Sequence, residues 1–240
     1  MSDGGPDRLA RRAVRPTGWA LAILAPLWLF LVLSAPVDSV QGVVQKILYV
    51  HVPCAFATYA AFACTAVGGA LYLWRRDEAW DRFAASAAEV GVLFCLLVIA
   101  TGPIWARASW GRWWSWDLRL TLTLLLFLVY LSYLLLRSFT EGSERTARFA
   151  AVYGIAGLAI VPLNYLAIDL AGGRSIHPEN LQRGSLGAGM RAPFWLGVLT
   201  GLVAFAHLLA RRVELAALRE RAAARDAAHG ARAGEAPWAT

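Results

Sequence analysis

The chain has 240 residues, of which 58% are hydrophobic and only 16% are charged, whereas a soluble domain of this size carries about 25% charged residues. The charges lie in short clusters between long apolar runs, so the composition excludes an ordinary soluble domain. It predicts an all-α, polytopic integral membrane protein surrounded by membrane lipid. The net charge of +7 comes from dispersed arginines, and we therefore expect no nucleic-acid partner.

The N-terminal residues 1–17 form a basic segment with four arginines, followed by the apolar run 18–36. A secretory signal peptide has a similar arrangement, but this run is long enough to cross a membrane and no small-residue cleavage site clearly follows it. We therefore expect a retained first helix. The later apolar runs predict five more spanning helices, at 50–73, 84–106, 119–137, 149–170 and 193–210.

Positively charged residues favour the cytoplasmic side of a membrane protein. The N-terminal segment, the loops at 75–82 and 137–148, and the segment 211–240 together hold 16 arginines, whereas the other three loops hold seven basic residues. Both termini are therefore expected in the cytoplasm. Residues 18–210 would form a six-helix membrane domain, and 211–240 a cytoplasmic tail that continues the last helix and frays after Gly230.

A histidine stands at the outer start of the second predicted span, in the sequence LYVHVPCAF. Pro53 suits the first turn of a helix, so His51 is expected at or just before the helix start, at the depth of the membrane interface. A lone histidine there is either a hydrogen-bonding interface residue or part of a site. The cysteines Cys54, Cys64 and Cys95 lie in apolar runs without CxxC spacing. They predict neither a disulfide framework nor a zinc site, but small buried side chains.

A tryptophan-rich segment, IWARASWGRWWSWDLRLT, separates the third and fourth predicted spans and contains five of the 11 tryptophans. Four of its residues have the spacing i, i+3, i+4, i+7, namely Trp110, Trp113, Trp114 and Asp117. On a short helix along the membrane surface they would share one face, with Trp116 projecting elsewhere. An interfacial tryptophan belt is one explanation. The other is a platform that stacks on a large planar apolar ligand.

Asp117 directly precedes the fourth predicted span, where a carboxylate suits the positive end of a helix. Capping the helix is compatible with a role in a site. His177 lies in the sequence GGRSIHPEN between the fifth and sixth predicted spans, and the proline after it favours extended backbone. The topology places His51 and His177 on the side of the tryptophan-rich segment. His207, in the last span, and His229, in the tail, are expected to be structural or incidental.

Two histidines beside an aromatic platform match the requirements of haem. Imidazoles are common axial ligands of haem iron, and arginines bind carboxylates such as the haem propionates. We therefore predict a non-covalent, b-type haem with bis-histidine ligation by His51 and His177. Arg119 is the first propionate partner to test, although snorkelling to the interface explains it equally well. The other candidates on this side are Arg112, Arg174, Arg183 and Arg191.

The segment from Trp110 to Asp117 matches the pattern WGxxWxWD, and an Arg-Leu-Thr sequence continues it. It thereby resembles the haem-handling family of cytochrome c maturation proteins. The YVHVP context of His51 and the RSIHP context of His177 are similar to those of the family's two external histidines. Six predicted spans make the chain most similar to the small branch of that family, haem exporter protein C (CcmC), over about residues 19–210. Many members carry a tryptophan-rich run before the second histidine, and this chain does not.

The resemblance implies a multi-pass protein of the inner membrane that binds haem on its periplasmic face. It also implies delivery of haem to the chaperone CcmE, in association with the transporter subunits CcmA and CcmB and the small helix CcmD. With His51 and His177 as iron ligands, the expected haem-contacting residues are Trp110, Gly111, Trp113, Trp114, Trp116, Asp117 and Arg119.

The sequence shows no nucleophile–base pair and no GxxxxGK[ST] motif for binding a nucleotide. We therefore expect a haem-delivery protein rather than an enzyme. Two alternatives stay open at this point. One is a haem lyase that attaches haem directly to apocytochrome c, for which the chain is small. The other is a structural membrane subunit of a haem transporter, whose tryptophans only anchor it.

Overall fold

The computed structural model describes residues 5–139, 143–180 and 186–234. Within these ranges no strand forms, apart from an isolated bridge between Asp38 and Gly42, and six helical segments are long and apolar enough to cross a membrane. The predicted fold class, an all-α multi-pass membrane protein, is confirmed. In chain order the elements are α1 (Gly5–Ser34), the 3-10 helix η1 (Val43–Ile47), α2 (Leu48–Arg75), α3 (Glu78–Trp110), α4 (Leu118–Phe139), α5 (Glu144–Leu158), α6 (Ile160–Leu170) and α7 (Arg191–Gly234).

Several helices differ in extent from the apolar runs that predicted them. α1 begins inside the N-terminal basic segment, and α7 continues to Gly234, beyond the predicted fraying at Gly230. Alanine and arginine dominate this last stretch, and both favour helix. The fifth predicted span is divided at Ala159 into α5 and α6. Pro162 accounts for the division, because it has no N–H to donate to the carbonyl of Leu158.

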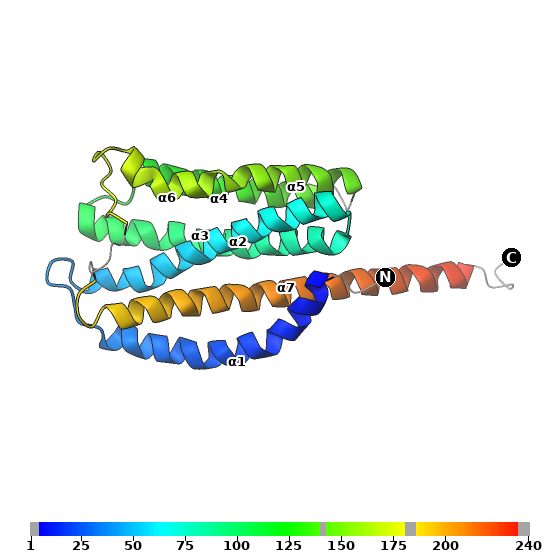
Figure 1. The fold of residues 1–240 in the computed structure, drawn as a ribbon, viewed down its shortest axis with the longest axis horizontal. Helices are drawn as coiled ribbons and strands as arrows, with labels where there is room; N and C mark the ends of the chain where they lie inside the picture. The colour runs from blue at the N-terminus through cyan, green and yellow to red at the C-terminus, as the bar shows by residue number, and fades with distance from the viewer. Residues whose placement is uncertain (1–4, 140–142, 181–185, 235–240) are drawn as a thin grey trace.

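Helix α2 lies at the centre of the bundle. It packs along α3 and also contacts α5 and α7, while α1 lies against α7 and α4 against α6 (Figure 1). Ala57 and Ala61 of α2 and Ala87 of α3 are fully buried. At Gly91 of α3, a Cβ atom would lie 2.6 Å from the ring of Phe62, so this crossing requires glycine. Small residues of this kind let membrane helices approach closely.

The three cysteines also lie in the helical interior. Cys54 and Cys95 are buried and Cys64 is half-buried, and all three are free thiols in the described structure. Their placement agrees with the expectation of small apolar side chains.

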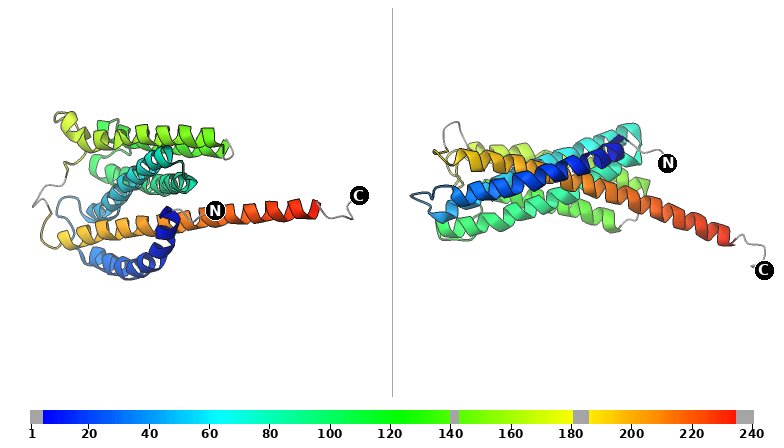
Figure 2. Two further views of the ribbon diagram at one scale, coloured as in Figure 1. Left: turned by 45° about the vertical axis from the view of Figure 1, so that its right-hand side comes forward. Right: turned by 90° about the horizontal axis from the view of Figure 1, so that it is seen from below.

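The loops that carry or adjoin the candidate residues gather at one end of the bundle. Residues 35–47, 111–117 and 171–180 lie there, whereas the start of α1 and the long extension of α7 lie toward the opposite end (Figure 1, Figure 2). We call the first end the tryptophan end and the second the arginine end. The start of α2 with His51, the tryptophan-rich segment and the loop with His177 therefore lie at one end, as the alternating topology predicted.

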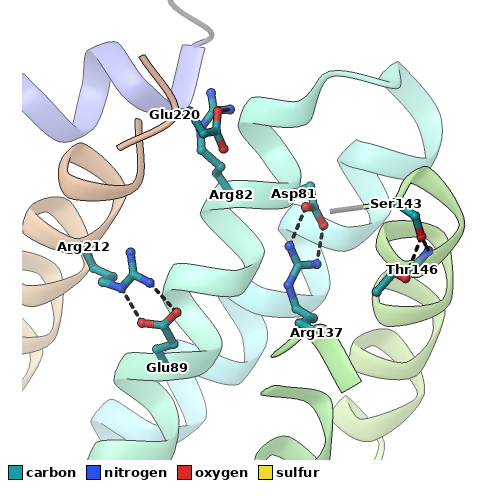
Figure 3. Close-up of polar contacts among 8 residues, drawn as sticks. All are labelled: Asp81, Arg82, Glu89, Arg137, Ser143, Thr146, Arg212 and Glu220. Atoms are coloured by element: carbon teal, nitrogen blue, oxygen red, sulfur yellow. Dashed lines mark hydrogen bonds and ion pairs between the residues drawn. The ribbon is translucent and has the colours of Figure 1, made fainter. Parts of the chain in front are cut away.

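Ion pairs join the helices at the arginine end. Arg82 of α3 binds Asp7 of α1 at 2.8 Å and Glu220 of α7 at 2.5 Å. Arg137 of α4 makes two hydrogen bonds, of 2.7 and 2.6 Å, with the carboxylate of Asp81 on α3 (Figure 3). The Arg82 pairs fasten the long extension of α7 and the first turn of α1 to α3, and the Arg137 pair joins α4 to α3, all far from the tryptophan end.

Candidate functional site at the tryptophan end

The tryptophan-rich segment is not a helix along the membrane surface, so that prediction was wrong. Helix α3 continues to Trp110 and ends there, because Gly111 adopts a left-handed conformation with φ 72°. The N–H of Gly111 bonds to the carbonyl of Arg107 at 3.1 Å, and the guanidinium of Arg107 bonds to the carbonyl of Gly111. Residues 111–117 are then irregular up to the start of α4. The indoles consequently do not share a single helical face.

The indoles form two edge-to-face pairs. The rings of Trp105 and Trp110 lie 5.0 Å apart between centroids, and those of Trp114 and Trp116 lie 6.0 Å apart. Trp113 and Trp116 are 60% and 77% exposed, which leaves aromatic surface available at this end.

Two hydrogen-bond donors next to these indoles lack partners. Trp114 Nε1 and Ser115 Oγ are buried, and neither bonds to any residue that the structure describes. Unpaired buried donors cost free energy unless a ligand or water supplies an acceptor. Nearby, Trp105 Nε1 donates to Gln41 Oε1 at 2.9 Å, which attaches the loop after α1 to the end of α3.

Asp117 has the capping role that its position predicted and a second role as well. Its Oδ1 accepts the N–H of Arg119 at 2.9 Å in the first turn of α4, and its Oδ2 accepts the N–H of Ile176 at 3.0 Å. Burial raises the pKa of the Asp117 carboxyl, but hydrogen bonds from Ser175 and from the two N–H groups outweigh it and lower the pKa below its usual value. The ionised carboxylate thus joins α4 to the loop that carries the second candidate histidine.

His177 lies in an irregular loop, as predicted. The ring nitrogen Nδ1 of His177 lies 2.8 Å from the carbonyl oxygen of Pro178. The backbone N–H of His177 donates to Ser175 Oγ at 3.2 Å. Because a carbonyl only accepts, Nδ1 carries the proton and Nε2 keeps a lone pair. Burial lowers the pKa of His177, although the hydrogen bond to Pro178 opposes this. The neutral imidazole, which is the form that binds metals, is therefore favoured.

His51 lies in the first turn of α2, which begins three residues earlier at Leu48. Its Nδ1 is 2.9 Å from Thr101 Oγ1 on α3. Gly102, the next residue on α3, leaves room for the imidazole, since a Cβ atom there would lie 3.3 Å from His51 Cε1. The side chain is thus positioned by α3, at the same end of the bundle as His177.

Arg119 is close enough to both histidines to influence their charge. His51 interacts electrostatically with both Arg119 and His177, and His177 interacts with Arg119. The guanidinium of Arg119 donates to Asn180 Oδ1 at 2.7 Å, three residues after His177. The backbone carbonyl of Arg119 accepts from Asn164 Nδ2 at 3.1 Å, so α6 also holds this turn of α4. The structure therefore brings together the two histidines, Arg119 and Asp117.

The other predicted arginines lie differently. Arg112 is exposed, whereas Arg174 and Arg191 donate to the nearby carbonyls of Ala171 and Leu186. Arg183 lies outside the described residues. Neither remaining histidine joins the site: His207 Nδ1 lies 3.0 Å from Thr17 Oγ1, between α1 and α7, and His229 bonds within α7.

Sequence reasoning missed several residues that position the site, among them Gln41, Thr101, Asn164, Ser175 and Asn180. Thr101 and Asn164 are polar residues within apolar runs, and a buried polar side chain needs a partner. That signal was available, although it does not say which partner. Gln41 and Asn180 lie in loops, where polar residues are ordinary and give no such signal.

Comparison with known proteins gives consistent matches. The family model described as "Heme exporter protein C" matches residues 6–232. The "Heme exporter protein C" of Bradyrhizobium diazoefficiens is 32% identical over 219 residues, covering 89% of this chain and 81% of that protein. The protein of the same name from Paracoccus denitrificans is 32% identical over 210 residues, covering 85% of each chain. A "Putative cytochrome c biosynthesis ccmC-like mitochondrial protein" of Marchantia polymorpha is 34% identical over 150 residues, covering 62% of this chain and 61% of that protein.

Proposed function

The chain belongs to the haem exporter protein C family, which handles haem in cytochrome c maturation, and we propose that it binds haem non-covalently between His51 and His177. One observation carries the proposal: His51 and His177 come from distant parts of the chain and both lie at the tryptophan end, where Arg119 and Asp117 bind the loop of His177 to the start of α4. Imidazoles are common axial ligands of haem iron. The pair thus offers one ligand for each face of a b-type haem.

The groups around the histidines suit the rest of the haem molecule. The guanidinium of Arg119 can bind a propionate with charge-assisted hydrogen bonds. Trp114 Nε1 and Ser115 Oγ are buried donors without partners in the described structure, and carboxylate oxygens would supply the missing acceptors. The exposed rings of Trp113 and Trp116 would cover apolar macrocycle surface. Trp110, Gly111 and Asp117 shape the segment that presents these groups.

Delivery rather than catalysis is the role we propose. The family description names an exporter component, and the haem would pass to the periplasmic chaperone CcmE with help from CcmA, CcmB and CcmD. In this arrangement the protein lies in the inner membrane. Residues 1–17 and 211–240 face the cytoplasm, and the site of the membrane domain 18–210 faces the periplasm. A haem lyase would instead form covalent product when co-expressed with an apocytochrome alone, and that product would contradict delivery.

The direct test is a haem titration of the full-length protein in detergent. The wild type should give a Soret band and the α and β bands of a low-spin, bis-imidazole haem. His51→Ala and His177→Ala should each weaken haem retention or change these bands. His229→Ala is the matched control, because His229 is exposed and bonds to the Arg225 carbonyl of its own helix. Unchanged spectra in both site variants would refute the ligand assignment.

A further inference from the structure

The hydrogen bond between His51 and Thr101 has a definite direction. Thr101 Oγ1 lies 2.7 Å from the carbonyl oxygen of Leu97 on the preceding turn of α3, and that carbonyl only accepts. A hydroxyl has one proton to donate, so Thr101 gives it to Leu97. In the 2.9 Å contact with His51 Nδ1, the hydroxyl oxygen must therefore be the acceptor, and Nδ1 must carry the proton.

The consequence concerns the other ring nitrogen of His51. A neutral imidazole protonated at Nδ1 keeps its lone pair on Nε2. Within residues 5–139, 143–180 and 186–234, no group forms a hydrogen bond with His51 Nε2. That nitrogen is thus available to a ligand, and the ring is oriented by α3 before any ligand arrives.

We propose that Thr101 is a positioning residue for haem, which fixes the tautomer and the ring orientation of His51 so that Nε2 faces the iron. The inference rests on the proposed function, because it assumes that His51 is an axial ligand. A hydrogen-bond acceptor on the second nitrogen of a metal-bound histidine fixes the ring and makes the ligating nitrogen more basic. The Thr101 hydroxyl supplies this acceptor from a different helix, so the packing of α2 against α3 becomes part of the site.

The two histidines differ in the origin of their acceptors. His177 donates to the backbone carbonyl of Pro178, which no side-chain substitution removes. His51 donates to the hydroxyl of Thr101, so a substitution at position 101 can either remove this acceptor or retain it. Thr101→Val removes the hydroxyl at nearly constant shape, and Thr101→Ser keeps it. Thr101→Ala provides a second way of removing the hydroxyl if the valine variant does not fold.

The first test needs no haem. Full-length protein with 15N-labelled histidine is studied by NMR in detergent, and the His51 signals are identified by their loss in His51→Ala. The wild type and Thr101→Ser should show His51 protonated at Nδ1. Thr101→Val and Thr101→Ala should show a mixture of tautomers or mainly the Nε2-protonated form. An unchanged Nδ1-protonated form in both variants without the hydroxyl would overturn the proposal.

The second test uses the haem-loaded protein. Thr101→Val should weaken haem binding about 10-fold, the lower range for loss of such a supporting hydrogen bond, and should raise the midpoint potential, since a less basic ligand favours the ferric state less. Thr101→Ser should remain within about twofold of wild type. Equal affinity and potential in wild type and Thr101→Val, with a clear loss in His51→Ala, would reject the Thr101 assignment alone. No effect of His51→Ala would reject the proposed function itself.

Discussion

Asp117 Oδ2 accepts the backbone N–H of Ile176 at 3.0 Å across 59 residues of sequence. The same carboxylate caps α4 through Oδ1. The start of α4, which carries Arg119, and the loop that carries His177 are therefore held by one side chain. The geometry of the proposed site depends on this connection as much as on the ligands themselves.

Asp117→Ala should lower both the stability and the haem affinity of the protein. Loss of a helix cap costs about 1 kcal/mol, and loss of the Ile176 contact frees the loop before His177. Ser143→Ala is the matched control, since Ser143 caps α5 at the arginine end by accepting the Thr146 N–H. Thermal unfolding should show a loss of stability in both variants, at least as large in Asp117→Ala as in Ser143→Ala, and haem titration should show a loss of affinity only in Asp117→Ala. Equal haem affinities in the two would contradict the role of Asp117 as a tether.

Arg119→Gln should weaken haem binding by about 10-fold, because charge-assisted hydrogen bonds contribute about 1.5–3 kcal/mol each. The substitution keeps hydrogen-bonding capacity toward Asn180 but removes the positive charge that acts on both histidines. Arg112→Gln is the comparison, because Arg112 is exposed. Haem affinity is measured by titration at two ionic strengths. The difference in affinity between Arg119→Gln and Arg112→Gln should be smaller at high salt, because salt screens the charge. A larger loss of haem affinity in Arg112→Gln than in Arg119→Gln would indicate that Arg112, not Arg119, binds the propionate.

The overall arrangement was predictable because it follows from quantities that are local in the sequence. Apolar runs locate the six spans, and alternation along the chain then places His51, residues 110–117 and His177 at one end. The conformation of residues 111–117 was not predictable in this way. The i, i+3, i+4 spacing suggested a helix, but α3 ends at Gly111, where two local hydrogen bonds with Arg107 form. The periodicity of side chains does not indicate where such a helix terminus lies.

Contacts between helices were beyond sequence reasoning for a different reason. Which residues face each other depends on the rotation and register of each helix. An apolar run in a membrane determines neither of these, because lipid is as apolar as the side chains of the run. The pairing of His51 with Thr101, and of Asn164 with the turn at Arg119, is set by how α2, α3, α4 and α6 pack. The sequence alone shows only that the third and fifth apolar runs contain polar residues, Thr101 and Asn164 among them.

Arg82→Ala should destabilise the protein without changing its haem spectrum. Arg82 pairs with the buried Asp7, whose side chain is 4% exposed, and breaking a buried ion pair by removing one partner costs about 3 kcal/mol or more. Arg148→Ala is the matched control, because its pair with Glu144 is largely exposed on both sides and such pairs contribute less than about 1 kcal/mol. Unfolding followed by circular dichroism should separate the two variants. A changed Soret band in Arg82→Ala would show that the arginine end influences the site.

The proposed delivery of haem to a periplasmic chaperone requires the tryptophan end to face the periplasm. Val40 is 91% exposed at that end, and His229 is exposed on the extension of α7. In a background with the native cysteines replaced by alanine, Val40→Cys should react with a membrane-impermeant maleimide in intact spheroplasts. His229→Cys should react only after permeabilisation. The arginine distribution supports this orientation, with 16 arginines in the segments at the arginine end and seven basic residues in the others. The reverse labelling pattern would place His51 and His177 toward the cytoplasm, where a periplasmic chaperone cannot receive haem from them.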